Sequence, residues 1–287
     1  MKDYLKLARV KHYLKNILIA IPLFFSGMVF EEKNILTILF GFLTFSFICS
    51  IIYIINDIRD VEKDKLHEVK RKRPIASGKI SKKKAIIFAI ILGILSISIE
   101  TIFIGFSNYN YIFLIAYFIL NLGYSFGLKD IPLLDVIILV SGFVLRIAYG
   151  GAIFDISVSN WLYLTVFAIS FYLAFGKRRN EILKSNGQTR KVLSYYSKDF
   201  LDKNMYLFLT IAIIFYSLWC VDPITVNNTK NMMIFTVPLV IIICLRYSMI
   251  IETDGYGDPV DVVFSDKLLI FLGILYIGFL SILLYIV

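Results

Sequence analysis

The hydrophobic pattern of this chain is a succession of long apolar stretches separated by polar connections. About 20 apolar residues are needed for a helix to cross the hydrocarbon core of a bilayer. Nine stretches reach or approach that length: 16–30, 35–55, 85–106, 110–127, 132–153, 160–176, 204–221, 231–251 and 268–287. Two long polar connections cover 56–84 and 177–203, and a shorter one covers 252–267. The pattern predicts an all-α integral membrane protein of about nine transmembrane helices, forming one domain over 1–287.

The positive charges give this arrangement an orientation. With nine spans the two chain ends lie on opposite faces, and 25 of the 30 lysines and arginines then fall on one face. They lie in residues 1–15, in the two long connections and at Lys129, whereas Lys33 and Lys230 fall on the other face. Because cytoplasmic loops carry the excess of lysine and arginine, we expect the N-terminus and the long loops to be cytoplasmic. The expected location is the plasma membrane.

Composition supports the membrane prediction and excludes some functions. The chain is 59% hydrophobic and 18% charged, with a mean hydropathy of +0.79, which is too apolar for a soluble globular domain. Its net charge of +9 is accounted for by the topology, so no nucleic acid is expected as a partner. No small-residue cleavage site follows the first apolar run, and we expect that span to remain in the protein.

Three aspartates follow the second apolar stretch at helical spacing. If that helix continues past Ile55, then Asp57, Asp60 and Asp64 lie on one of its faces, with Asn56 beside them. Like charges so close together destabilise a helix unless a cation separates them. Mg²⁺ is typically held by one or two carboxylates together with water and phosphate oxygens. The spacing therefore predicts a magnesium site where the chain leaves the membrane.

Clustered cations follow the aspartates and recur in the second long loop. The first cluster is Lys70, Arg71, Lys72 and Arg73, and a second one begins at Lys177 and Arg178. Phosphate binding and topology account for such clusters about equally well. Further on, "RPIASGKISKKKA" predicts a turn, with Ser81 as the N-cap of the third span. The segment "ETDGYGDPVD" predicts an ordered turn or lid.

Several polar residues lie close to or within apolar stretches. Asp135 and Arg146 are eleven residues apart, which places them on one face of the fifth span. Charged side chains within a membrane usually face a cavity or each other, so this face is expected to border a pocket. Tyr124 and Lys129 are consistent either with the same pocket or with positions at the membrane interface.

These motifs resemble those of a known family. "NDIRDVEKDKLHEVKRKRPIASGKIS" is similar to the NDxxDxxxD signature and the RP-containing segment of the UbiA superfamily of intramembrane prenyltransferases. The segments "GYSFGLKDIPLLDVIILVSGFVLRIAYGG", "AFGKRRNEI" with "RKVLSYYS", and "LRYSMIIETDGYGDP" resemble its decaprenyl-phosphate phosphoribosyltransferase branch. The resemblance covers essentially the whole chain. It implies helices around a central cavity that opens to the cytoplasmic side and binds a magnesium diphosphate.

The resemblance also implies an activity and the residues that perform it. The expected reaction is Mg²⁺-dependent transfer of 5-phosphoribose from phosphoribosyl pyrophosphate to a polyprenyl phosphate. The residues expected to act in catalysis are Asp57, Asp60, Asp64 and Lys129, with the three aspartates as metal ligands. The residues expected to bind substrate are Asn56, Lys70, Arg71, Arg73, Tyr124, Asp130, Asp135, Arg146, Lys177 and Arg178.

Two other functions are consistent with parts of the sequence. A related enzyme would move a prenyl group from a prenyl diphosphate to an aromatic or lipid acceptor. Against an aromatic acceptor, the chain after Tyr124 lacks the second aspartate-rich pattern of the aromatic prenyltransferases. A transporter would show broken helices in matching halves, and no matched pair is seen. The sequence leaves the isoprenoid length, the oligomeric state and the number of metal ions open.

Overall fold

The computed structural model describes residues 2–105, 108–184, 191–254 and 259–286, and every regular element in these ranges is a helix. The all-α prediction is therefore confirmed for the described residues. They form two compact units: Met1–Phe24, Met28–Phe126 and Leu145–Ser157 make up the first, and Phe25–Gly27, Gly127–Val144 and Val158–Val287 the second. Part of the predicted turn in 252–267, residues 255–258, lies outside the described residues, as does 185–190 of the second long loop.

In the part of the chain that the structure describes, six helices are long and apolar enough to cross a membrane. They cover Asn34–Arg59, Lys82–Ile104, Leu134–Ile153, Lys198–Cys220, Met233–Thr253 and Lys267–Tyr285. The other three predicted stretches also fall on helical structure, so the count of nine spans stays a prediction. In the first stretch the helix changes type next to Pro22, which lacks the N–H that an α-helical hydrogen bond requires.

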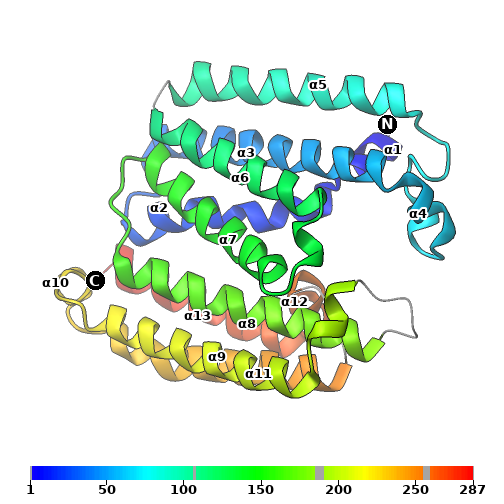
Figure 1. The fold of residues 1–287 in the computed structure, drawn as a ribbon. Coiled ribbons are helices and arrows are strands. Elements are labelled where there is room, and N and C mark those ends of the chain that lie inside the picture. Colours follow the sequence, from blue (N-terminus) through cyan, green and yellow to red (C-terminus); the bar gives the residue numbers. More distant parts are fainter. Residues whose placement is uncertain (1, 106–107, 185–190, 255–258, 287) are drawn as a thin grey trace. The chain divides into compact units, whose positions relative to one another are not determined.

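The first unit is built on the long helix α3. Its helices are α1 (Lys2–Ala8), η1 (Val10–Ala20), α2 (Ile21–Phe25), α3 (Glu32–Arg59), α4 (Val61–Leu66), η2 (Lys70–Lys72), α5 (Lys82–Ile99), η3 (Glu100–Ile104), α6 (Asn108–Ser125) and the end of α7 (Leu134–Ile153). Helices α3 and α5 run side by side (Figure 1). The side chain of Ser81 accepts a hydrogen bond from the amide of Lys84, which confirms the predicted N-cap of α5.

Two apolar clusters hold this unit together. Leu7, Ile54, Val61, Ile75 and Ile80 belong to one cluster, which joins α1, α3, α4 and the segment after η2. The other cluster joins η1, α3, α6 and α7. By contrast, α5 exposes a row of isoleucines, as expected of a helix that faces lipid. The first cluster brings the N-terminal helix and the loop after α4 to the end of α3, where the aspartates lie.

The second unit packs long helices around one aromatic-rich cluster. It contains the start of α7, η4 (Leu128–Asp130), α8 (Asn160–Lys184), η5 (Lys191–Tyr195), α9 (Lys198–Cys220), α10 (Pro223–Thr229), η6 (Met233–Thr236), α11 (Val237–Asp254), α12 (Pro259–Ser265) and α13 (Lys267–Tyr285). Helices α8 and α9 lie side by side (Figure 1). Val136, Tyr172, Phe175 and Leu201 are among the buried residues of the cluster. It fixes the helices that carry Asp135 and Arg178.

Gly150 allows the backbones of α7 and η1 to approach closely. A Cβ atom at this position would lie 2.1 Å from the carbonyl oxygen of Ile19. We expect Gly150→Ala to push η1 and α7 apart and to lower the free energy of unfolding by roughly 1–3 kcal/mol or more. Thermal unfolding in detergent measures this loss. The matched control is Gly273→Ala, because a Cβ there would meet nothing within 4 Å. Equal midpoints for the two variants would contradict the assigned contact.

Candidate active site

The predicted aspartate face is present only in part, because the helix bends. Helix α3 ends at Arg59, and Asp60 takes φ −89° and ψ 10° before α4 begins at Val61. The expectation of one continuous helix through Asp64 is therefore wrong. Within the described residues no set of three or more histidine, cysteine, aspartate or glutamate side chains is arranged to hold a metal ion. The proposed roles of the three aspartates as metal ligands stay a prediction.

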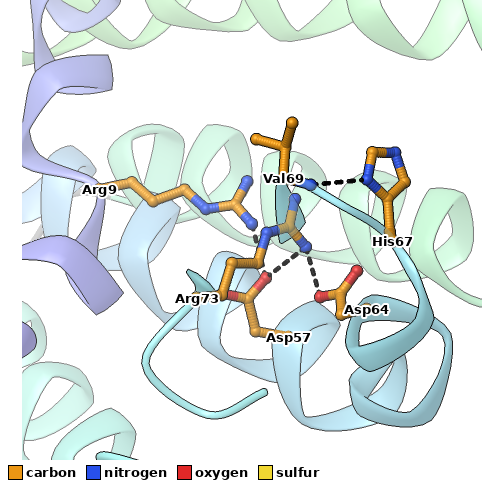
Figure 2. Close-up of polar contacts among 6 residues, drawn as sticks. All are labelled: Arg9, Asp57, Asp64, His67, Val69 and Arg73. Atoms are coloured by element: carbon orange, nitrogen blue, oxygen red, sulfur yellow. Dashed lines mark hydrogen bonds and ion pairs between the residues drawn. The ribbon is translucent and has the colours of Figure 1, made fainter. Parts of the chain in front are cut away.

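Two of the three carboxylates nevertheless meet (Figure 2). Nη1 of Arg73 donates to Oδ1 of Asp57 at 3.1 Å and to Oδ2 of Asp64 at 2.6 Å. Both aspartates are buried, with 2% and 3% of their surface exposed. Arg73 precedes Pro74, and a residue before proline is disfavoured in a helix. Accordingly η2 ends at Lys72, and Arg73 is extended with φ −65° and ψ 146°.

A second arginine reaches the same carboxylate from the N-terminal segment. Nη2 of Arg9 donates to Oδ1 of Asp57 at 2.5 Å, and the guanidinium carbon of Arg9 lies 4.5 Å from the ring centre of Tyr53. Arg9 separates α1 from η1 and has a left-handed backbone, with φ 53° and ψ 47°. Sequence reasoning missed this residue, since the contact joins positions 48 residues apart and no local motif marks it.

The geometry of the pair suits a divalent cation. A single nitrogen atom of Arg73 reaches one oxygen of Asp57 and one of Asp64, so a cation placed between the two carboxylates could contact both. Carboxylate oxygens are the ligands that Mg²⁺ prefers, and one or two of them are usual in its protein sites. Asp57 and Asp64 therefore fit a magnesium ion that completes its coordination with water and phosphate oxygens.

The first long polar connection contains further residues that were predicted to bind metal or phosphate near Asp57 and Asp64. Asn56, Asp60 and Lys70 are partly exposed, and Arg71 is exposed. His67, which is partly exposed, accepts a hydrogen bond at Nδ1 from the amide of Val69 (Figure 2). Tyr124, at the end of α6, is also partly exposed.

Arg146 forms a buried polar network elsewhere in the first unit. Its Nε donates to Oδ1 of Asn16 at 2.8 Å, and its Nη2 donates to the hydroxyl of Tyr117 at 3.1 Å. The guanidinium carbon also lies 4.9 Å from the ring centres of Phe45 and Tyr117. Arg146 thus ties α7 to η1, α3 and α6. Its role in binding substrate stays a prediction.

In the second unit, Asp135 and Arg178 form a fully buried ion pair. Nε of Arg178 donates to Oδ2 of Asp135 at 2.6 Å, and neither side chain is exposed. The hydroxyl of Tyr196 donates to Oδ1 of Asp135 at 2.6 Å and accepts from the amide of Leu133 at 2.7 Å. Burial and the hydrogen bond to Asp135 raise the pKa of Tyr196 to about 12, so this phenol stays protonated at neutral pH.

This network holds the turn at Leu133, which directly follows the segment with two further predicted residues, Lys129 and Asp130. Leu133 has a left-handed backbone with φ 67°, a conformation that costs free energy in a residue other than glycine and is held here by its hydrogen bond to Tyr196. The preceding helix η4 contains Lys129, which is partly exposed, and Asp130, which is exposed. Lys177, next to Arg178 on α8, is also partly exposed.

Comparison with known proteins identifies the family. The model of the UbiA prenyltransferase family matches residues 18–258. The chain belongs to this family. Its UbiA relatives include the decaprenyl-phosphate phosphoribosyltransferase of Corynebacterium glutamicum, 33% identical over 92% of this chain and 81% of the relative. The protein of the same name from Mycolicibacterium smegmatis is 31% identical over 96% and 90%.

The fold agrees with this assignment. The solved structure of a UbiA homolog from Archaeoglobus fulgidus, bound to DMAPP and Mg²⁺, covers 99% of this chain with a TM-score of 0.71 and 19% identity. The match also includes 100% of the chain of that solved structure. The resemblance predicted from the motifs is therefore confirmed: this protein is a multi-pass membrane enzyme of the UbiA prenyltransferase family.

Proposed function

We propose that this enzyme transfers 5-phosphoribose from phosphoribosyl pyrophosphate to a polyprenyl phosphate, with Mg²⁺ as its cofactor. The observation that carries the proposal is similarity over more than nine-tenths of the chain to two relatives named decaprenyl-phosphate phosphoribosyltransferase. In the reaction the bond between the anomeric carbon and the diphosphate breaks, and an oxygen of the acceptor phosphate bonds to that carbon. Diphosphate leaves with the electron pair of the broken bond.

The aspartate and arginine cluster in the first unit suits the donor's diphosphate. Asp57 and Asp64 would hold Mg²⁺, with Asp60 beside them, and the metal would stabilise the charge that develops on the leaving diphosphate. Arg73, together with Asn56, Lys70 and Arg71, would bind phosphate oxygens. Arginine suits this role, since its planar guanidinium forms paired hydrogen bonds with phosphate.

The acceptor requires little help from the protein. A phosphate monoester has its second pKa near 6 and is mostly dianionic at neutral pH, so it is already a nucleophile without a strong general base. We assign the remaining predicted roles by family resemblance: Lys129 in catalysis, and Tyr124, Asp130, Asp135, Arg146, Lys177 and Arg178 in substrate binding. The isoprenoid tail would remain in the lipid, and the cytoplasmic face of the plasma membrane would supply the soluble donor.

A second candidate is prenyl transfer from a prenyl diphosphate. The UbiA homolog that shares this fold was solved with DMAPP and Mg²⁺, and an acidic pair that holds a magnesium diphosphate would serve either donor. The two functions differ in the donor's second phosphate, because phosphoribosyl pyrophosphate carries a 5-phosphate in addition to its diphosphate.

A parallel donor assay separates the two functions. Detergent-purified protein with Mg²⁺ is given labelled phosphoribosyl pyrophosphate and a polyprenyl phosphate in one tube, and labelled prenyl diphosphate and an aromatic acid in another. We expect label to enter the lipid phase in the first tube, and EDTA to abolish this transfer. Transfer only in the second tube would show that the enzyme is a prenyltransferase and would overturn the proposed donor.

A further inference from the structure

Two arginines neutralise the buried aspartates in the position where a metal would bind. Asp57 accepts from Arg9 and Arg73 at the same oxygen, and Asp64 accepts from Arg73 (Figure 2). The four side chains together carry two negative and two positive charges. A buried carboxylate is stable only when it is paired, so the cluster is balanced without a metal ion. A divalent cation would bring two additional positive charges to the same oxygens.

Both arginines can leave the carboxylates without being drawn from a closed core. The side chain of Arg9 is 20% exposed and that of Arg73 is 26% exposed, whereas those of Asp57 and Asp64 are 3% and 5% exposed. The carboxylates are thus the more buried part of the cluster and the arginines the more accessible part, as displacement of the arginines by a soluble phosphate ligand requires.

The backbone at Arg9 shows that its placement has a cost. A left-handed conformation in a residue other than glycine costs on the order of 1 kcal/mol, and such residues cluster at functional sites. The ring of Tyr53 holds the guanidinium by a cation–π contact that does not depend on Asp57. Arg9 therefore has a support that remains in place when its carboxylate partner changes.

We infer that Arg9 and Arg73 exchange partners when the donor binds: they pair with Asp57 and Asp64 in the free enzyme and with the donor's diphosphate once a divalent cation occupies the carboxylates. This inference rests on the proposed function for the presence of a magnesium diphosphate. Charge balance favours the exchange, because the cation takes over the neutralisation of the aspartates and the arginines then neutralise phosphate oxygens. No covalent bond changes in this step.

Partner exchange makes a specific prediction about metal binding. In the free enzyme a metal ion must displace two arginines from their carboxylates, so the metal alone binds weakly. Diphosphate gives the displaced arginines new partners, so the metal and diphosphate bind cooperatively. By linkage, each ligand must then tighten the binding of the other by the same factor. An arginine that only braced the fold would contribute nothing to this coupling.

The test measures Mn²⁺ binding by electron paramagnetic resonance, with and without inorganic diphosphate, in detergent-purified protein. Mn²⁺ replaces Mg²⁺ because carboxylate sites accept both ions. Arg9→Gln and Arg73→Gln are compared with wild type, and Arg59→Gln is the control. Arg59 is exposed near the end of α3 and contacts the ring of Phe126, so its replacement removes one positive charge two residues from Asp57.

We expect each cluster variant to bind Mn²⁺ alone about tenfold more tightly than wild type, because one competing cation is gone. We expect the tightening caused by diphosphate to fall by about tenfold or more in the same variants, and both quantities to be unchanged in Arg59→Gln. Two results would overturn the inference: unchanged or weaker binding of Mn²⁺ alone in both cluster variants, or no Mn²⁺ binding by wild type even with diphosphate. The assay uses no phosphoribosyl donor, so a failed donor assay leaves its outcome interpretable.

Discussion

Replacing Asp57 by asparagine is expected to lower turnover by on the order of a thousandfold or more, with the protein still folded in the membrane. Asparagine keeps the shape of the side chain and an oxygen at the position that accepts from Arg9 and Arg73. It removes the charge that a divalent cation requires. Asp64→Asn is expected to behave in the same way, because its carboxylate meets the same arginine. Initial rates of phosphoribosyl transfer measure both effects.

The control for these variants is Glu62→Gln. This carboxylate lies on α4, is exposed, and pairs with Lys65 one helical turn away. Exposed pairs of this kind contribute little to stability, so we expect near-normal turnover. Near-normal turnover in Asp57→Asn as well would contradict the metal assignment. A comparison with Asp60→Asn then shows whether the aspartate at the bend contributes as much as the two that converge.

Breaking the buried ion pair of the second unit is expected to have the largest effect on stability. Arg178→Met leaves the charge of Asp135 buried without its cation, which costs about 3–5 kcal/mol of the free energy of unfolding. In the double variant Asp135→Leu and Arg178→Met both charges of the pair are gone, whereas Tyr196 loses its acceptor and Glu181 its cation, so we expect part of the loss to be recovered. Thermal unfolding in detergent gives the four values of the cycle. Lys203→Met, which removes an exposed cation from α9, is the control.

The sign of the coupling free energy between Asp135 and Arg178 shows whether the two residues act as a pair. A buried pair predicts a double variant that is more stable than Arg178→Met alone, whereas independent sites predict losses that add. Additive losses would mean that the contact of 2.6 Å between Arg178 and Asp135 contributes nothing beyond packing. The result also bears on function, since Asp135 and Tyr196 hold the turn that follows Lys129 and Asp130.

Local features of this protein could be read from the sequence because local physics determines them. Apolar length predicted the long helices, and each expected apolar stretch falls mainly on helical structure, whereas short helices such as α1, α4 and α12 lie outside those stretches. A serine before a charged helical segment predicted the N-cap at Ser81, and the structure confirms it. The NDxxDxxxD motif predicted the family, which the comparison confirms. In each case the signal lies within one contiguous segment of the chain.

Features that depend on distant contacts were not predictable from the sequence. The spacing of Asp57, Asp60 and Asp64 predicts a shared face only for an unbroken helix. No glycine or proline near Asp60 indicates the break between α3 and α4. Arg9 reaches Asp57 because Leu7 and Ile54 pack in one apolar cluster, a contact between segments far apart in the chain. From the sequence, Tyr196 was identified only as part of the segment "RKVLSYYS". Its hydrogen bond to Asp135 joins positions far apart in the chain and could not be predicted.

The most direct test of the central claim follows the fate of each half of the donor. Phosphoribosyl pyrophosphate is labelled in its ribose in one sample and in the β-phosphate of its diphosphate in another, and both are incubated with a polyprenyl phosphate and Mg²⁺. We expect the ribose label to enter the lipid phase with wild type while the phosphate label stays in water as diphosphate, and neither label to enter the lipid phase with Asp57→Asn. Entry of the phosphate label into the lipid phase, or ribose transfer undiminished by Asp57→Asn, would contradict the account.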